Sequence, residues 1–189
     1  MDLMSAADEV YALRPEEFVG RRDALAAEAR AVGDRVLAAD IKKLTKPTMA
    51  AWVANLLVRR RPEQVDEVLG LGAALREAQA AMAGDQLREL GRQRRRLTSA
   101  VTREARQLAS ELGQHVADPV AAQVEETLHA AMVDESAADA LRTGMLVRPL
   151  TVAGVEGVDV SGVVAVPGAT GAPAVRRTPP PARRPDLSV

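Results

Sequence analysis

Positively charged side chains are concentrated in two stretches of the sequence, and they are the residues best suited to do chemistry. Residues 41–62 contain six Lys and Arg and no acid, and residues 88–106 contain seven Arg against two acids. If each stretch is helical, its cations can share a face and bind the phosphate backbone of a nucleic acid. The residues predicted to contact phosphate are Lys42, Lys43 and Lys46 in the first stretch, and Arg92, Arg95, Arg96 and Arg103 in the second.

The overall charge favours a different interpretation of the same residues. The chain of 189 residues carries 25 Lys and Arg against 26 Asp and Glu, for a formal net charge of −1. Residues 107–139 contain seven acids and no Lys or Arg. The basic helices could therefore pair with acidic helices of the same molecule and leave an ordinary solvated surface. Both interpretations stay open on the sequence alone.

The sequence offers little for catalysis or metal binding. It has no Cys and two His, which excludes thiol catalysis and zinc–thiolate sites and leaves little scope for a histidine base. Glu126 and His129 have the Glu-x-x-His spacing of di-iron bundles, but those sites need a second such motif and two further Glu. No nucleophile elbow, phosphate-binding loop or dinucleotide fingerprint occurs. We therefore expect a non-enzymatic protein with no cofactor and no metal.

The elements that would carry the first cations are predicted to be helices. Ser5 and Asp8 have the spacing of a capping box, which predicts a short helix at the N-terminus. A second helix is expected after Pro15, with Val32 and Val36 among the residues of its buried side. The Gly-Asp pair at positions 33 and 34 is expected to break or kink that helix.

A third helix is predicted over residues 46–61, with Thr45 as its N-cap. It carries an apolar stripe at helical spacing, formed by Met49, Trp52, Val53, Leu56 and Leu57. We expect Trp52 to be buried because it lies within this stripe. Asn55 lies beside the stripe and is expected to cap or bridge.

The second group of cations is predicted to lie on a long antiparallel helical hairpin over residues 62–113. Pro62 can begin its first helix, and Gly84 separates the first helix from the second. The second helix has a heptad-like apolar seam, formed by Leu87, Leu90, Leu97, Val101, Leu108 and Leu112. Arg94 interrupts this seam, which argues against a dry coiled-coil dimer unless an acid from a partner faces it.

The remaining chain is predicted to contain two further helices, a short extended segment and a disordered tail. Asp118 and Pro119 can begin one helix, and Gly144 is placed to end the next. The resulting division is 1–61 (N-terminal helices), 62–113 (hairpin), 114–150 (C-terminal helices), 151–166 (extended segment) and 167–189 (disordered basic, Pro-rich tail). We therefore expect an all-α helical bundle with a long antiparallel hairpin.

The distribution of apolar and aromatic residues predicts the location of the protein and the composition of its core. The N-terminus has no apolar segment of the signal-peptide kind, and the longest near-apolar stretch is too short to span a membrane. We therefore expect a cytoplasmic protein with no integral membrane segment. Only three aromatic residues occur, so the core is predicted to be built from Ala, Val and Leu in closely packed helices.

A resemblance supports the helical expectation. Residues 43–55 combine a Lys46-Pro47-Thr48 turn with the segment Ala51-Trp52-Val53-Ala54-Asn55. This combination resembles a family of uncharacterised actinobacterial helical proteins, in which a Lys-Pro-Ser/Thr turn precedes an Ala-Trp-x-x-Asn helix. Residues 11–18 and 141–148 are similar to the same family. The resemblance implies a helical fold and an actinobacterial origin, and it implies no activity, cofactor or site.

The sequence therefore favours a non-enzymatic protein that binds nucleic acid, DNA or RNA, through phosphate contacts by its two basic groups. The alternative is a protein-interaction or scaffold module, in which the hairpin pairs with a partner helix or with a second copy of the chain. These two hypotheses depend on different residues of the hairpin. Nucleic-acid binding depends on the arginines of the hairpin, whereas a scaffold depends on its apolar seam.

Overall fold

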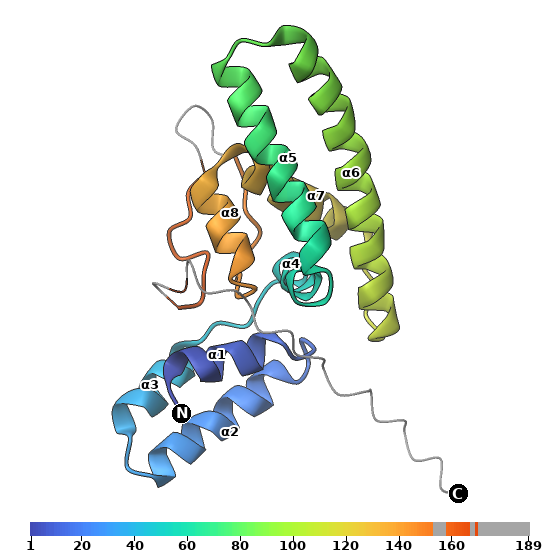
Figure 1. The fold of residues 1–189 in the computed structure, drawn as a ribbon. Helices are drawn as coiled ribbons and strands as arrows, with labels where there is room; N and C mark the ends of the chain where they lie inside the picture. Colours follow the sequence, from blue (N-terminus) through green and yellow to red (C-terminus); the bar gives the residue numbers. More distant parts are fainter. Residues whose placement is uncertain (153–157, 167–168, 170–189) are drawn as a thin grey trace, which may run out of the picture.

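The computed structural model describes residues 1–152, 158–166 and 169. These residues form eight helices, arranged as a bundle from which a long hairpin projects (Figure 1). In chain order the helices are α1 (Leu3–Tyr11), α2 (Phe18–Ala31), α3 (Arg35–Lys43), α4 (Met49–Arg60), α5 (Pro62–Ala80), α6 (Gly84–Glu111), α7 (Asp118–Val133) and α8 (Glu135–Arg142). Within the described ranges there are isolated bridges but no β-strand, so the predicted all-α fold is confirmed.

The first three helices form a small unit around a separate apolar core, to which Met145, Val166 and Ala169 also contribute. Tyr11, Phe18, Leu25 and Ile41 are among its buried side chains. The rings of Tyr11 and Phe18 meet edge to face with their centroids 5.1 Å apart, a favourable aromatic geometry. This unit presents the end of α3, and with it the first group of predicted cations, to solvent.

Two details of the N-terminal prediction are wrong. Asp2, not Ser5, caps α1, because its carboxylate accepts a hydrogen bond from the Ser5 amide at 2.7 Å. The chain also turns at Gly33, where φ is +87°. Val32 follows the end of α2 and Val36 lies in the first turn of α3, where they are 82% and 75% exposed instead of buried.

Helix α4 lies at the centre of the molecule and is buried along nearly its whole length. It contacts α5, α6, α7 and α8. Its N-cap is Thr48 instead of Thr45, since the Thr48 hydroxyl accepts a hydrogen bond from the Ala51 amide at 3.2 Å. Trp52 is 2% exposed, which confirms that it belongs to the core. Its indole N–H donates to the carbonyl of Leu13 at 2.8 Å, so this polar atom is satisfied.

Helices α5 and α6 form the predicted hairpin, and its distal half projects beyond the other helices (Figure 1). Val101 and Leu108 of the predicted seam are buried near the base, whereas Leu87 and Leu90 near the tip are only partly buried. The seam residues therefore belong to the apolar core near the base of the hairpin and are partly exposed to solvent near its tip.

Helices α7 and α8 complete a second apolar core, which they share with α4, α5 and α6. Gly144, with φ +60°, follows α8 as predicted. Residues 145–147 then run antiparallel to residues 163–165. The Val147 amide donates to the Val163 carbonyl at 2.8 Å, and the Ala165 amide donates to the Met145 carbonyl at 3.0 Å. Residues 163–165 of this pairing lie within the segment 151–166 that was predicted to be extended, whereas residues 145–147 precede it.

The two cores divide the helices after Leu44, because α4 packs with the hairpin and the C-terminal helices instead of with α1–α3. The disordered tail predicted over residues 167–189 lies outside the described residues, apart from Ala169. None of the helices in the described ranges combines the length and the hydropathy needed to cross a bilayer.

Candidate nucleic-acid interface and adjoining cavity

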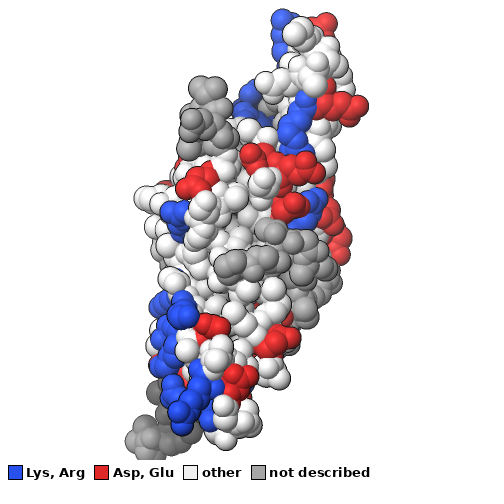
Figure 2. Space-filling view, turned by 90° about the vertical axis from the view of Figure 1, so that its left-hand side faces the viewer, with Lys and Arg blue, Asp and Glu red and all other residues white. Residues whose placement is uncertain are grey.

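The first predicted group lies at the end of α3 and in the connection to α4. Lys42, Lys43 and Lys46 are all exposed, and Figure 2 shows Lys and Arg side chains gathered over the end of the molecule formed by the N-terminal helices. Lys42 Nζ lies 3.0 Å from Asp23, and Lys43 Nζ lies 2.8 Å from Asp40. The hydrogen bond from Lys42 lowers the pKa of the Asp23 carboxyl. Two of the three cations are thus partnered within their own unit.

Two of the other cations of the first basic stretch, Arg59 and Arg61, bind groups from distant parts of the chain. Arg59 is 2% exposed, and its Nη1 donates to Asp8 at 2.7 Å. The Nε and Nη2 of Arg59 donate to the carbonyl of Gly144 at 3.3 and 3.2 Å. Arg61 pairs with Glu104 of α6 at 2.8 Å. A stretch without acids in the sequence is therefore compensated by acids from distant parts of the chain.

The second predicted group lies on the outward face of α6. Its members are Arg92, Arg95, Arg96 and Arg103, and all four are exposed. At about 100° of rotation per residue they fall within an arc of roughly 100°, on the side opposite the buried Val101. Arg92 pairs with Glu89 one turn earlier in α6. The other three make no salt bridge with any residue that the structure describes.

Acids flank this face of α6 but do not interrupt it. Asp85 pairs with Arg88 at 3.2 Å near the start of α6, and Asp118 pairs with Arg106 at 2.9 Å near its end. Between them, residues 90–103 contain no Asp or Glu. We call the exposed face formed by Arg92, Arg95, Arg96 and Arg103 the arginine face.

Neighbouring helices bring two acids beside the arginine face. Glu67 of α5 lines a surface hollow with Arg96, and Glu125 of α7 lines another with Arg95. Neither carboxylate comes within the 4.0 Å of a salt bridge to these arginines. Internal pairing of basic against acidic helices, the alternative raised by the net charge, is therefore partial at α6.

The structure does not bring the two predicted groups together. Helix α3 lies in the N-terminal unit at one end of the molecule, whereas α6 forms the far edge of the hairpin (Figure 1). A ligand contacting both groups at once would have to pass around the bundle. The arginine face has more cations available for a ligand than the first group, because three of its four members form no salt bridge with a described residue.

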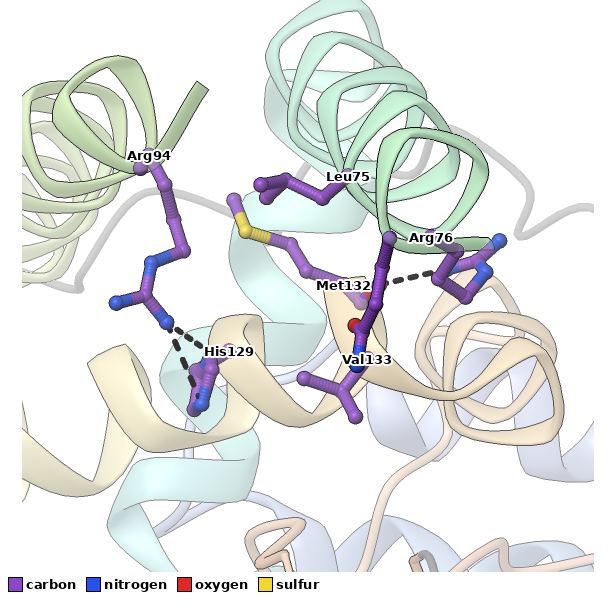
Figure 3. Close-up of a pocket in the computed structure, with 8 residues that line it drawn as sticks. Leu75, Arg76, Arg94, His129, Met132 and Val133 are labelled. Carbon is purple, nitrogen blue, oxygen red and sulfur yellow. Dashed lines mark hydrogen bonds between the residues drawn. The ribbon is translucent and has the colours of Figure 1, made fainter. Parts of the chain in front are cut away.

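A cavity of about 270 Å³ lies beside the arginine face, where α5, α6 and α7 meet. Its walls include Leu75, Arg76, Arg94, His129, Met132 and Val133. Figure 3 shows the side chains of Arg94 and His129 pointing toward each other from α6 and α7, with Arg94 Nη1 2.9 Å from His129 Nδ1. On the other side Arg76 donates to the carbonyl of Met132 at 2.6 Å, which satisfies a backbone group in the last turn of α7.

The electrostatics of the cavity keep His129 neutral over a wider pH range than a solvent-exposed histidine. Partial burial lowers the pKa of His129 most, the nearby Arg94 cation lowers it further, and Glu126 opposes both effects. The neutral ring can accept a hydrogen bond from Arg94, which the imidazolium could not. Arg94 itself has no carboxylate within salt-bridge distance among the described residues.

The bridging role expected for Asn55 is confirmed. Its side chain donates to the Leu146 carbonyl at 2.9 Å and accepts from the Leu146 amide at 2.8 Å. The sequence analysis did not predict that Trp52, Asn55 and Arg59 all form hydrogen bonds to distant parts of the chain. Their spacing of three and four residues on one helix was the available signal, because it places three polar groups along a single side of α4. The pairing of Arg94 with His129 had no such signal, since the two residues belong to separate segments.

Comparison with known proteins adds nothing to these observations: no protein-family model, curated protein or solved structure matches the chain. Within the described ranges, no three His, Asp or Glu side chains are grouped closely enough to hold a metal ion. The arginine face and the cavity beside it are therefore the two features of the described residues that suit a ligand.

Proposed function

We propose that this protein binds nucleic acid without sequence specificity, through the arginine face of α6. The observation that carries the proposal is the exposure of Arg95, Arg96 and Arg103 on one side of a helix, where none of them forms a salt bridge with a described carboxylate. Such cations can displace condensed counterions from a phosphate backbone, and the release of those ions drives binding. The protein supplies contacts and no chemistry.

The dimensions of the arginine face suit a phosphate backbone. From Arg92 to Arg103 the helix rises about 16 Å, which is the axial span of four to five phosphates on one strand of a duplex. Guanidinium groups bind phosphate oxygens through paired N–H donors. None of these contacts involves a base edge, so the proposed binding is tolerant of sequence and sensitive to salt.

The first group has a secondary part in this proposal. Lys42 and Lys43 would have to exchange Asp23 and Asp40 for phosphate, whereas Lys46 is exposed and forms no salt bridge with any described residue. Because α3 and α6 lie in different parts of the molecule, the first group cannot simply extend the arginine face. Its contact with phosphate stays a prediction that the experiment below tests separately.

The decisive experiment compares two triple variants that remove the same charge. Arg95→Gln/Arg96→Gln/Arg103→Gln removes the unpartnered cations of α6, and Lys42→Gln/Lys43→Gln/Lys46→Gln removes the first group. We expect the α6 variant to weaken binding to random-sequence duplex DNA or RNA on the order of tenfold at low salt. The plot of log K against log salt has a negative slope, and we expect this slope to become less steep by about 3, which is about 1 for each lost phosphate contact. Fluorescence anisotropy at several salt concentrations measures both quantities.

The lysine variant distinguishes a localised site from a general charge effect. If both variants lose affinity equally, net charge decides binding and the assignment to the arginine face is wrong. If the wild-type protein binds neither DNA nor RNA at low salt, the proposal fails as a whole. The alternative, a scaffold that pairs through the hairpin, would then be tested by Leu97→Asp in the seam, with light scattering to follow assembly.

A further inference from the structure

The cavity between α5, α6 and α7 combines an apolar wall with a cationic edge. Leu75, Met132 and Val133 supply the apolar surface. Arg94 stands at one side of it and Arg76 at the other (Figure 3). Apolar walls with a few convergent polar groups are the usual composition of a site for a small molecule.

Arg94 is a cation that has no counterion among the described residues, and it lies at the edge of this apolar surface. It occupies a position in the hairpin seam that would otherwise be apolar, and its described partner is the uncharged His129 ring. An arginine has five N–H donors, so the contact with one imidazole leaves most of them without an acceptor. A partly buried guanidinium in this state gains more from an anion than an exposed one, because water screens it less.

The neighbouring side chains indicate on which side of Arg94 an anion would bind. A second hollow, about 440 Å³, shares Arg94 and His129 with the cavity, but Glu125 lines it and would repel an anion. No acid of the part of the chain that the structure describes lines the cavity itself. The space next to Leu75 and Met132 is therefore the favourable side for negative charge.

We propose that the cavity binds a small amphipathic carboxylate, with its carboxylate on Arg94 and its hydrocarbon part against Leu75, Met132 and Val133. His129 accepts a hydrogen bond from Arg94 and so holds the guanidinium in place for the ligand. This inference does not rest on the proposed nucleic-acid binding, because Arg94 lies on the inner side of α6 and the arginine face on the outer side.

The size of the cavity sets the size of the ligand. An engineered apolar cavity of about 150 Å³ accommodates benzene, so a cavity of about 270 Å³ has room for a chain of roughly six to eight carbons. A ligand of that size binds with a Kd on the order of 1 mM, given the usual free energy of binding per atom. Octanoate is therefore the probe for this site.

The test follows the methyl NMR signals of Leu75, Met132 and Val133 during titration with sodium octanoate. We expect saturable shifts at these three residues, weaker binding of octanol and no binding of octylamine, because Arg94 recognises the negative charge. Equal affinity for octanol and octanoate would overturn the role of Arg94. Shifts confined to other methyl groups, or no saturable shift, would overturn the site.

Two glycines provide a matched pair of variants. A Cβ at Gly91, which lines the cavity, would meet no atom within 4 Å, so Gly91→Leu extends a side chain into the cavity without a clash at its base. Gly70 on the exposed side of α5 is equally unobstructed and does not line the cavity. We expect Gly91→Leu to abolish octanoate binding and Gly70→Leu to leave it unchanged.

Arg94→Gln completes the test by removing the charge while keeping a polar side chain. We expect it to weaken octanoate binding by about tenfold or more, the usual effect of losing a charged hydrogen bond. Octanol binding should change little. Retained octanoate binding in both Gly91→Leu and Arg94→Gln would show that the ligand binds elsewhere and would overturn the proposal. Neither variant alters the arginine face, so nucleic-acid binding is assayed independently.

Discussion

At the scale of single residues, identical side chains have different roles according to what faces them. Arg59 is buried and contacts a carboxylate and a backbone carbonyl. Arg94 faces a neutral imidazole, and Arg95 faces solvent and pairs with no acid of the described ranges. The charge is the same in all three, but only the last two can offer it to a ligand. A count of cations along the sequence therefore overstates the charge that is available for binding.

His129 should make the stability of the protein depend on pH in a window below 6.5. Its pKa in the folded protein is lowered from 6.5, chiefly by burial and then by Arg94. Between the folded and unfolded pKa values the unfolded chain binds more protons, so protonation favours unfolding. The free energy of unfolding should be highest above about pH 6.5 and decrease as the pH falls through this window. Urea unfolding at pH 7.5 and pH 5.5 measures the difference.

Two histidine variants test whether His129 causes this pH dependence of stability. His129→Gln keeps an acceptor for Arg94 but removes the titration, so the loss of stability between pH 7.5 and pH 5.5 should be smaller than in the wild type. His115→Gln, at an exposed position, serves as the control. If His129→Gln and the wild type lose the same stability over this range, the stated role of His129 is incorrect.

At the scale of elements, α5 shows how a helix is shaped by the helix packed against it. Gly70 and Gly72 are two residues apart, yet they face opposite environments. A Cβ at Gly70 would meet nothing within 4 Å, whereas a Cβ at Gly72 would lie 2.6 Å from the Cα of Met132. The close approach of α5 to α7 requires the second glycine and not the first. That approach also places Leu75 and Met132 on one wall of the cavity.

Replacing each of these glycines with alanine should change stability in opposite directions. Gly70→Ala should stabilise the protein by about 0.5–1 kcal/mol, because alanine restricts the unfolded chain and suits a helix. Gly72→Ala should destabilise it by about 1–3 kcal/mol, because α5 and α7 must separate to admit the methyl group. Urea unfolding at pH 7.5 gives both values. A stabilising Gly72→Ala would mean that α5 and α7 do not pack this closely.

At the scale of the whole molecule, two cores are joined by polar contacts to α4. The N-terminal unit is connected through Asp8 and Leu13, which bind Arg59 and Trp52. The chain beyond α8 is connected through Leu146, which exchanges two hydrogen bonds with Asn55. Buried polar contacts of this kind specify one arrangement of the parts, because each group is unsatisfied in any other.

Breaking the buried pair of Asp8 and Arg59 should therefore be costly. Arg59→Met leaves the Asp8 carboxylate without its cation, and a loss of about 3–5 kcal/mol is expected. Adding Asp8→Leu to Arg59→Met should recover much of this loss, since no charge then remains buried at the contact. Lys43→Gln, which removes an exposed pair with Asp40, should cost less than about 1 kcal/mol. Denaturant unfolding of the four proteins measures these differences.

The single variant Arg59→Met also tests whether the contact joins two otherwise separate units. If Arg59→Met produces a second, earlier unfolding transition in α1–α3, the pair couples the N-terminal unit to the rest. A double variant less stable than Arg59→Met alone would contradict the assignment, because it would show that Asp8 contributes without its partner.

The sequence by itself determined the helices and the hairpin. Apolar residues three and four apart, a proline at position 62 and glycines at 33, 84 and 144 are local signals, and they are visible because a helix forms from contacts within a few residues. The outward position of the arginine face followed from the same periodicity. The exposed Val32 and Val36 were mispredicted because α2 ends at Ala31, so the helical pattern of its buried side does not extend to either residue.

Only the tertiary structure decided which charges are free and where a cavity forms. Arg59 pairs with a residue 51 positions away, and Arg94 with one 35 positions away. Such pairings depend on how helices pack, which a local pattern does not encode. The same packing brings Gly72 against α7 and leaves room between Leu75 and Met132. Local periodicity therefore placed the cations on their helices, and long-range packing determined which of them can bind a ligand.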